Sequence, residues 1–285
     1  MSGVAGGPDL DLLARLAKEG DRSALERLIE SIRDDVYRLS MRMLWHPADA
    51  EDATQEIVIK LVTSLASFRG QASFRTCALT VSANHLRTAR RRRAEAAAAV
   101  SFEAFGEDLA QGLDTPYDGG GVDERLLEEE VKVGCTQAML LCLDREHRLA
   151  YILGEVFELP SSQAAEVLGI TAAAHRKRLS RARARVQAFM RGHCGLVDPA
   201  NRCRCRRRIG RAVEAGRLDP ARLLFAAHAR RRELEQPLTE MEGLNEAAAV
   251  MRSHPAYRAP EMSLSWISDL LRSGRLSIVA EGRDE

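Results

Sequence analysis

The chain has 285 residues, enough for two small helical domains and an appendage. Its formal net charge of +1 excludes a strongly basic or acidic protein, so any nucleic-acid contact must come from a local cluster of charge. No apolar stretch reaches the ~18–20 residues that a membrane helix needs, and residues 1–8 lack the pattern of a secretory signal. We therefore expect a cytoplasmic protein with no membrane partner.

Residues 9–93 are predicted to form a helical domain. Apolar residues recur at helical spacing along its first half: Leu25, Leu28, Ile29, Ile32, Val36, Leu39 and Met43. His46-Pro47 ends this stripe, and a second helix is expected from Ala48 to about Phe68. Its apolar face is predicted to hold Ala50, Ile57, Val58, Leu61 and Leu65.

The opposite face of this second helix is acidic. It carries Asp49, Asp52 and Glu56, with Gln55 at its edge and Ile59 exposed among the acids. By itself this pattern is typical of a solvated face. It also suits a surface that docks on a basic partner protein through charge and one apolar anchor.

A third helix is expected from about Ser73 to Arg93. Its end is basic, with Asn84, His85 and Arg87 followed by the Arg90–Arg93 run. Such an end favours contact with a phosphate backbone, although complementarity to the helix dipole explains it equally well. Residues 94–123 are rich in Ala, Gly, Asp and Pro, and their composition predicts a flexible linker.

Residues 124–190 are predicted to contain a helix-turn-helix. A short helix with Ala164, Ala165 and Leu168 precedes the turn Gly169-Ile170-Thr171, and a long basic helix follows from Ala172. One side of that helix should pack inward through His175, Leu179, Ala182, Val186 and Phe189. The other side presents Arg176, Lys177, Ser180, Arg181 and Ala184, which suits the major groove of DNA. His175 is interpreted as a buried structural histidine rather than a ligand.

Between His175 and Arg211 the chain carries 13 Lys or Arg residues and a single Asp. Within this basic stretch, residues 191–208 contain Cys194, Cys203 and Cys205 beside His193. Three soft ligands in twelve residues favour a zinc or other soft metal, for which a fourth ligand could be His193, His228, Cys135 or Cys142. The surrounding arginines are expected to lower the pKa of the thiols. Thiol redox chemistry and a disordered basic tail with incidental thiols remain open alternatives.

Together these motifs resemble an extracytoplasmic-function sigma factor of the sigma-70 family. The stretch Asp49–Glu56, then Phe68-Arg69-Gly70, Phe74-Arg75-Thr76, Asn84 and Arg90–Arg93, looks like conserved region 2. The stretch from Leu168 to Arg183 looks like region 4. The resemblance covers roughly residues 9–190. Cys77 departs from it, because the family usually has tryptophan there, and Ala173-Ala174-His175 departs from the usual opening of the recognition helix.

The resemblance implies an all-α chain: a region 2-like domain (1–93), the linker (94–123), a region 4-like domain (124–190) and a helical, cysteine-containing regulatory extension (191–285). It implies a non-enzymatic factor that directs initiation at promoters. The expected partners are promoter DNA and the core RNA polymerase, contacted at the clamp helices of the largest subunit and at the flap. A separate anti-sigma factor is an open possibility, since related extensions are thought to regulate in its place.

The implied site residues fall into three groups, and no cofactor is required. Polymerase binding is expected at Asp49, Asp52, Gln55 and Glu56. Contact with the −10 element is expected at Phe74, Arg75, Asn84, His85, Arg87, Arg90 and Arg91. Contact with the −35 element is expected at Ala173, Ala174, Arg176, Lys177, Ser180 and Arg181.

Two other functions fit the residues less well. An ordinary helix-turn-helix repressor or activator with a sensory C-terminal domain leaves the acidic helix and the Asn84–Arg93 segment unexplained. A cysteine- or metal-dependent enzyme lacks a nucleophile with a base, a metal-ligand pair with a catalytic carboxylate, and a phosphate-binding glycine loop.

Overall fold

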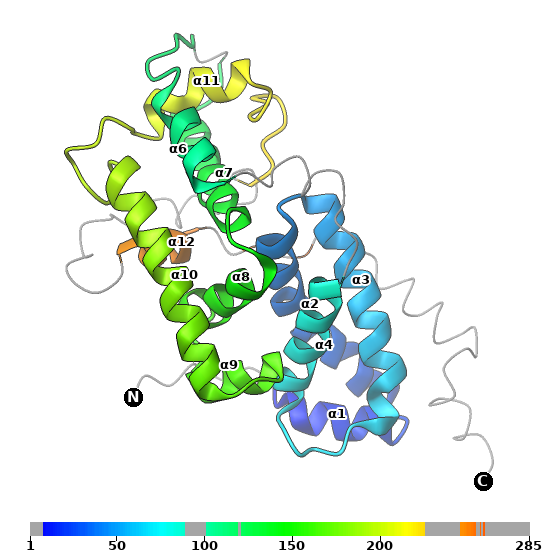
Figure 1. Cartoon of the computed structure of the whole chain (residues 1–285). Helices are drawn as coiled ribbons and strands as arrows, with labels where there is room; N and C mark the ends of the chain where they lie inside the picture. The colour runs from blue at the N-terminus through cyan, green and yellow to red at the C-terminus, as the bar shows by residue number, and fades with distance from the viewer. Residues whose placement is uncertain are drawn as a thin grey trace.

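The computed structural model describes residues 8–88, 101–118, 121–225, 246–254, 257 and 259. Within these ranges every regular element is a helix, which confirms the predicted all-α class (Figure 1). None of the described helices is long and apolar enough to cross a bilayer. The predicted contacts at Arg90 and Arg91 lie outside the described residues.

The N-terminal half is a bundle of helices. Its elements are α1 (Leu10–Lys18), α2 (Arg22–Leu44), α3 (Pro47–Ser64), the short 3₁₀ helix η1 (Leu65–Ser67) and α4 (Phe74–Thr88). Asp9 and Asp21 cap α1 and α2, each accepting hydrogen bonds from backbone N–H groups in the first turn. The break predicted at His46-Pro47 is real, with Pro47 as the first residue of α3.

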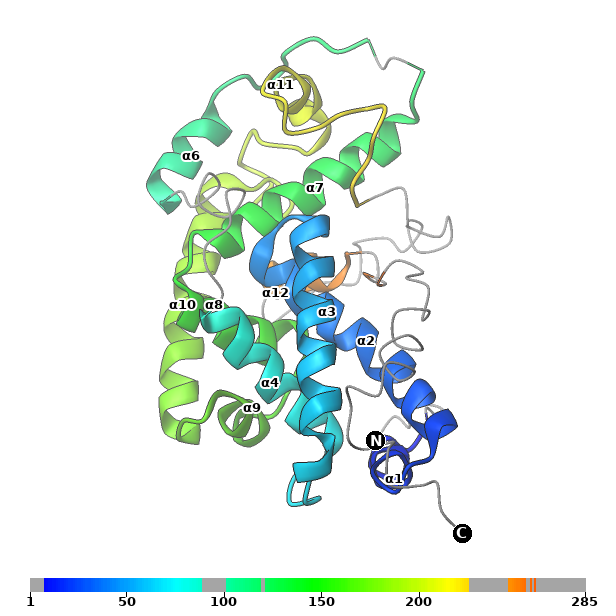
Figure 2. The ribbon, with the colours of Figure 1, turned by 90° about the vertical axis from the view of Figure 1, so that its right-hand side faces the viewer.

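The predicted apolar faces of this bundle are confirmed. On α2, every member of the stripe from Leu25 to Met43 is at most 3% exposed, and the five apolar residues predicted for the second helix are at most 4% exposed. α3 and α4 both pack against α2, as well as against each other, so both cover its apolar side (Figure 2). The acidic side of α3 is thereby turned away from the bundle.

The segment predicted as a flexible linker contains a helix, α6 (Phe102–Ala110), so the prediction is wrong for these residues. Ser101 caps α6, and Phe102, Phe105 and Leu109 recur at helical spacing. The first two rings pack on Phe189 with centroids 5.2 and 5.3 Å apart. The amphipathic pattern of α6 is short, and the Gly, Asp and Pro residues around it favour a flexible segment.

The second half carries the predicted helix-turn-helix. Its elements are α7 (Glu124–Leu141), α8 (Arg145–Tyr151), the π-helical turn η2 (Ile152–Val156), α9 (Ser161–Leu168) and α10 (Ala172–His193). Gly169 ends α9 in the left-handed region at φ 65°, where glycine pays no steric penalty. Thr171 then caps α10 by accepting a hydrogen bond from the backbone N–H of Ala174.

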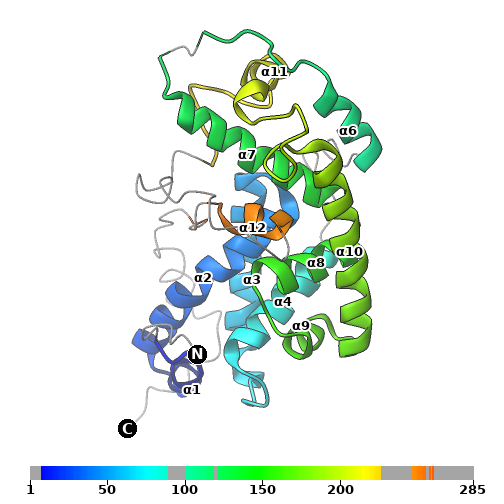
Figure 3. The same ribbon diagram turned by 90° about the vertical axis from the view of Figure 1, so that its left-hand side faces the viewer.

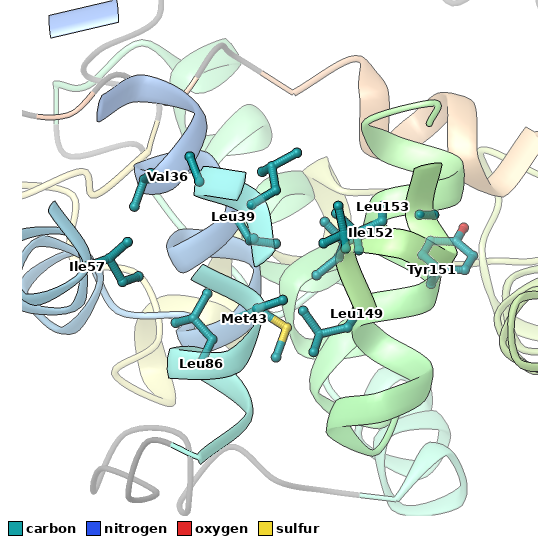
Figure 4. Close-up of a cluster of buried hydrophobic side chains, with 14 of the residues drawn as sticks. Val36, Leu39, Met43, Ile57, Leu86, Leu149, Tyr151, Ile152 and Leu153 are labelled. Atoms are coloured by element: carbon teal, nitrogen blue, oxygen red, sulfur yellow. The ribbon is translucent and has the colours of Figure 1, made fainter. Parts of the chain in front are cut away.

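The two halves share one hydrophobic core. Val36, Leu39, Met43, Ile57 and Leu86 from the first half meet Leu149, Tyr151, Ile152 and Leu153 from the second (Figure 4). The sequence pattern had indicated a separate core for each half. The structure therefore presents them in a closed arrangement, in which α4 lies against α9.

A buried guanidinium fastens this arrangement. Arg148 is 3% exposed and donates hydrogen bonds to the backbone carbonyls of Met43 (2.6 Å), Leu140 (2.9 Å) and Leu143 (3.0 Å). Met43 belongs to α2, whereas the other two acceptors lie at and beyond the end of α7. The side chain thus joins the halves while donating to carbonyls at the C-terminal ends of α2 and α7.

We expect Arg148→Met to lower the free energy of unfolding by about 3 kcal/mol, because it leaves buried carbonyls without donors. Urea denaturation followed by circular dichroism measures this. The exposed Arg15→Met should change the stability by less than about 0.5 kcal/mol. Equal stabilities of the two variants would contradict the role given to Arg148.

The extension after α10 folds back over both halves. It contains η3 (Arg206–Arg208), α11 (Ile209–Glu214) and α12 (Glu246–Arg252). α11 lies along α7, while α12 packs against α10, η2 and α7 of the second half (Figure 3). The extension is consequently part of the packed molecule and not a free tail over these residues.

Candidate nucleic-acid and polymerase interfaces

The outward side of α10 is a basic surface. Ala173, Arg176, Lys177, Ser180 and Arg181 are exposed, and Ala174 is half-buried. α9 and the N-terminal half of α10, joined by the turn, lie together at one end of the molecule (Figure 1). This is the placement by which a recognition helix enters the major groove.

Neighbouring arginines of α10 are held by carboxylates instead. Arg178 forms an ion pair of 2.5 Å with Glu146 of α8, and Arg183 pairs with the buried Glu155. These pairs lie on the flanks of α10 and tie it to the preceding elements. The basic residues of this helix are thereby divided between structural pairs and the exposed surface.

The inward side of α10 is buried as predicted: His175, Leu179, Ala182, Val186 and Phe189 are at most 8% exposed. Burial lowers the pKa of His175, with smaller contributions from Arg176 and Arg178. The histidine is therefore neutral and fills the core beneath the basic surface. This confirms its interpretation as a buried structural residue.

The −10 residues predicted on α4 occupy different environments. Phe74 is 3% exposed and packs edge-on against Phe68 at 5.4 Å, so it offers no surface to DNA in this structure. In this structure the ring of Phe74 is therefore part of the hydrophobic core, and the predicted contact with DNA is not available to it. Arg75 and Asn84 are exposed, and Arg75 pairs with Asp35 at 2.7 Å. His85 lies between Lys60 and Glu56 of α3.

The end of α4 contacts the helix-turn-helix. Arg87 pairs with Glu146 at 2.7 Å and donates a hydrogen bond to the carbonyl of Leu168 at 3.3 Å. In return, Arg145 donates to the carbonyl of Arg87 at 3.0 Å. Glu146 thus holds one arginine from each predicted DNA-binding helix, Arg87 and Arg178. No local pattern predicts this role for Glu146, because both of its partners come from other helices.

The acidic surface of α3 lies on the outside of the bundle. Asp52 and Glu56 are exposed, Asp49 and Gln55 are half-buried, and Ile59 is 37% exposed among them. Ile59 is one of the large apolar side chains that the described chain exposes. The surface combines negative charge with an apolar anchor, as the sequence predicted.

The cysteines of the extension gather with one from α7. Cys194, Cys203 and Cys205 line a cavity of about 130 Å³ together with Cys135. His193 is not among the lining residues; its ring packs at a tilt against Phe189, with centroids 4.7 Å apart. Cys142 lies apart at the end of α7, where its thiol donates to the carbonyl of Ala138. His228 lies outside the described residues.

The expected lowering of the thiol pKa values is wrong for three of these cysteines. Burial raises the pKa of Cys203, Cys205 and Cys135, and neighbouring thiols raise each of them further. Arg208 lowers the pKa of Cys203 and Cys135, but by less than burial raises it. Desolvation outweighs the arginines because the thiols face an apolar cavity.

A histidine anchors the far part of the extension. His254 Nε2 lies 2.7 Å from Thr136 Oγ1 of α7, and its Nδ1 lies 3.3 Å from the hydroxyl of Tyr257. Burial lowers the pKa of His254 well below its usual value, and Arg42 and Lys132 add to the lowering. The ring is therefore neutral when the extension is docked.

This site makes docking of α12 sensitive to pH. The pKa is about 6.5 when the ring is solvated and lower when it is docked, so the stability is full above about pH 6.5 and falls below it. We expect hydrogen exchange of residues 246–254 to accelerate from pH 7.5 to 5.5, after correction for intrinsic rates. His254→Gln should remove most of this difference. An equal pH dependence in the variant would contradict the assignment.

A helical fold, over the described residues, with a helix-turn-helix whose second helix exposes basic residues is typical of DNA-binding transcription proteins. Comparison with known families is more specific. Residues 28–96 match Sigma-70 region 2, and residues 134–186 match Sigma-70, region 4.

Curated relatives agree with the family match. RNA polymerase sigma factor YlaC of Bacillus subtilis is 30% identical over 164 residues, which cover 55% of this chain and 90% of YlaC. ECF RNA polymerase sigma factor SigK of a Mycobacterium species (strain KMS) is 33% identical over 147 residues, 51% of this chain and 74% of SigK. SigW of Bacillus subtilis is 26% identical over 175 residues, which cover 61% of this chain and 92% of SigW.

The chain belongs to the extracytoplasmic-function group of the sigma-70 family of RNA polymerase sigma factors. As such it acts with core RNA polymerase in promoter recognition and transcription initiation. Its region 4 match ends at residue 186, so the cysteine-containing extension lies beyond both matched regions.

Proposed function

We propose that the acidic surface of α3 binds the clamp helices of the largest polymerase subunit, while the exposed residues of α10 read the −35 element. The observation that carries this proposal is that both surfaces are exposed in the same molecule. α3 and α10 lie on opposite sides of it (Figure 1). The exposed residues near the end of α4 contact the −10 element. The chain works by binding, and it supplies no catalytic group.

Photo-crosslinking tests the assignment of the two surfaces. A photoreactive residue at Ala173 should crosslink upstream promoter DNA in the holoenzyme, and one at Ile59 should crosslink the largest subunit. Both side chains are exposed, so the replacements fit without repacking. Crosslinks in the reverse order, or at neither position in an active holoenzyme, would contradict the proposal.

The closed arrangement requires an opening step. Arg87 of α4 is held by Glu146 and Leu168, which belong to the half that carries α10. In this arrangement the −10 and −35 surfaces cannot separate to reach two distinct promoter elements. We infer that binding to core polymerase exchanges these internal contacts for contacts with polymerase and DNA.

The extension stabilises the closed arrangement because it bridges the halves. The ring of Tyr257 lies 4.8 Å from the guanidinium of Arg42 on α2, and its hydroxyl accepts a hydrogen bond from Gln137 on α7 at 3.0 Å. The backbone N–H of Ala259 donates to Asp34 of α2. On the α7 side, Glu130 accepts from the N–H groups of Leu224 and Phe225. These contacts support regulation of the factor by its own extension.

Tyr257→Ala in the full chain tests this regulation. It removes the bridge between Arg42 and Gln137, so we expect more transcript per mole of factor in reactions with limiting core polymerase. Tyr257→Phe keeps the ring over Arg42 and should give an intermediate increase. Unchanged or reduced transcription by a folded Tyr257→Ala would show that the extension does not restrain the factor.

A further inference from the structure

Four of the six cysteines line one cavity, although Cys135 is distant in sequence from the other three. Cys135 lies in the middle of α7, Cys194 directly follows α10, and Cys203 and Cys205 lie on the loop before η3. All four line the same cavity of about 130 Å³. The remaining two, Cys77 and Cys142, do not line it.

The loop that carries three of these thiols is built around them. Cys194 and Cys203 are paired in a backbone bridge, and the N–H of Gly195 donates to the carbonyl of Cys203 at 3.1 Å. Asn201 closes the loop by donating to the carbonyl of Cys194 at 3.2 Å. A Cβ on Gly195 would lie 2.3 Å from the Cys203 carbonyl oxygen, so only glycine allows this close approach.

The charge around the thiols also fits a bound cation with thiolate ligands. A divalent ion with four thiolates carries a net charge of −2, and Arg204, Arg207 and Arg208 follow Cys203 closely on the same loop and in η3. Arg208 is 5% exposed, and it donates hydrogen bonds to the Asp108 carboxylate and to carbonyls at the end of α6. Positive groups in the second layer commonly stabilise such a site.

Within the part of the chain that the structure describes, no three His, Cys, Asp or Glu side chains already converge on a metal position. Coordination therefore requires the thiols to turn. Each cysteine has one side-chain torsion with three staggered positions, so its Sγ can move without displacement of the backbone. Their shared cavity supplies the space for this movement.

We propose that Cys135, Cys194, Cys203 and Cys205 bind one structural zinc or other soft divalent ion and thereby fasten the start of the extension to α7. Four thiols release four protons as four metal–sulfur bonds form, with no change of oxidation state. Four thiolates complete the tetrahedral shell that structural zinc prefers. Cys135 replaces His193 as the fourth ligand, and the site joins the region 4 half to the extension.

The experiment uses the full chain, reduced and loaded with Zn²⁺ or Co²⁺. We expect one metal ion per chain by elemental analysis, and the charge-transfer and intense d–d absorption of tetrahedral thiolate coordination with Co²⁺. Cys135→Ser should weaken metal binding at least ten-fold. His193→Ala, Cys77→Ser and Cys142→Ser should each keep one ion with wild-type affinity.

Alkylation of the wild-type chain supplies a test that needs no variant to fold. With Zn²⁺ bound, the four ligand thiols should be protected, and a chelator should expose these four together, as read by mass spectrometry. Three results would overturn the proposal: no metal bound by the reduced chain, wild-type affinity in Cys135→Ser, or loss of the ion in His193→Ala. A disulfide between Cys194 and Cys203 as the stable state in reducing buffer would also overturn it.

Discussion

Replacement of both Arg176 and Arg181 by alanine is expected to reduce transcription from promoters that depend on a −35 element by roughly 30-fold or more. Both side chains are exposed on the outward side of α10. Each contact of a recognition-helix arginine with a base or phosphate contributes about 1–3 kcal/mol. Neither substitution touches the buried side of the helix, so the fold should be retained.

A matched control lies on the same helix. Arg191 is also exposed, but it lies near the C-terminal end of α10, away from the turn that leads into the recognition helix. Arg191→Ala should leave transcription within about two-fold of the wild type, because it changes the charge without changing the −35 surface. Equal losses of transcription in the control and the double variant would point to nonspecific attraction to DNA. They would contradict recognition of the −35 element by α10.

Reversal of charge at Asp52 and Glu56 is expected to abolish most binding to core polymerase. These exposed carboxylates form the outer part of the acidic surface of α3. Placing two lysines there sets like charges against a basic partner surface and costs several kcal/mol in association. Binding of labelled factor to core polymerase, measured by fluorescence anisotropy, should weaken by 100-fold or more.

Glu30→Lys together with Glu166→Lys serves as the control for total charge. Both glutamates are exposed and lie on other helices, α2 and α9. This variant changes the net charge by the same amount and should bind core polymerase nearly as well as the wild type. Comparable loss in both double variants would assign the effect to net charge and remove the special role of α3.

The burial of the long helices could be predicted from the sequence because their patterns are local and strongly periodic. The stripe from Leu25 to Met43 and the inward side of α10 each follow a helical period, and both are buried. The exposure of Ile59 was predictable for the same reason. The all-α class and the helix-turn-helix follow from these periodicities and from the turn at Gly169.

The contacts between the two halves could not be predicted from the sequence. The shared core and the buried Arg148 depend on how the halves pack, and no local pattern records that packing. Phe74 shows a second limit: a motif placed it among DNA contacts, whereas the fold uses its ring to pack on Phe68. The thiol cluster shows a third, since Cys135 lies in the middle of a helix far from the others and only the fold brings it to them.

Run-off transcription with purified core polymerase tests the central claim most directly. The full chain, added to core polymerase and a library of genomic promoter fragments, should produce discrete transcripts that start at a defined set of sites and are absent without the chain. The Asp52→Lys, Glu56→Lys variant should produce none of them. Stable binding of the chain to core polymerase with no promoter-dependent transcript from any fragment would contradict it.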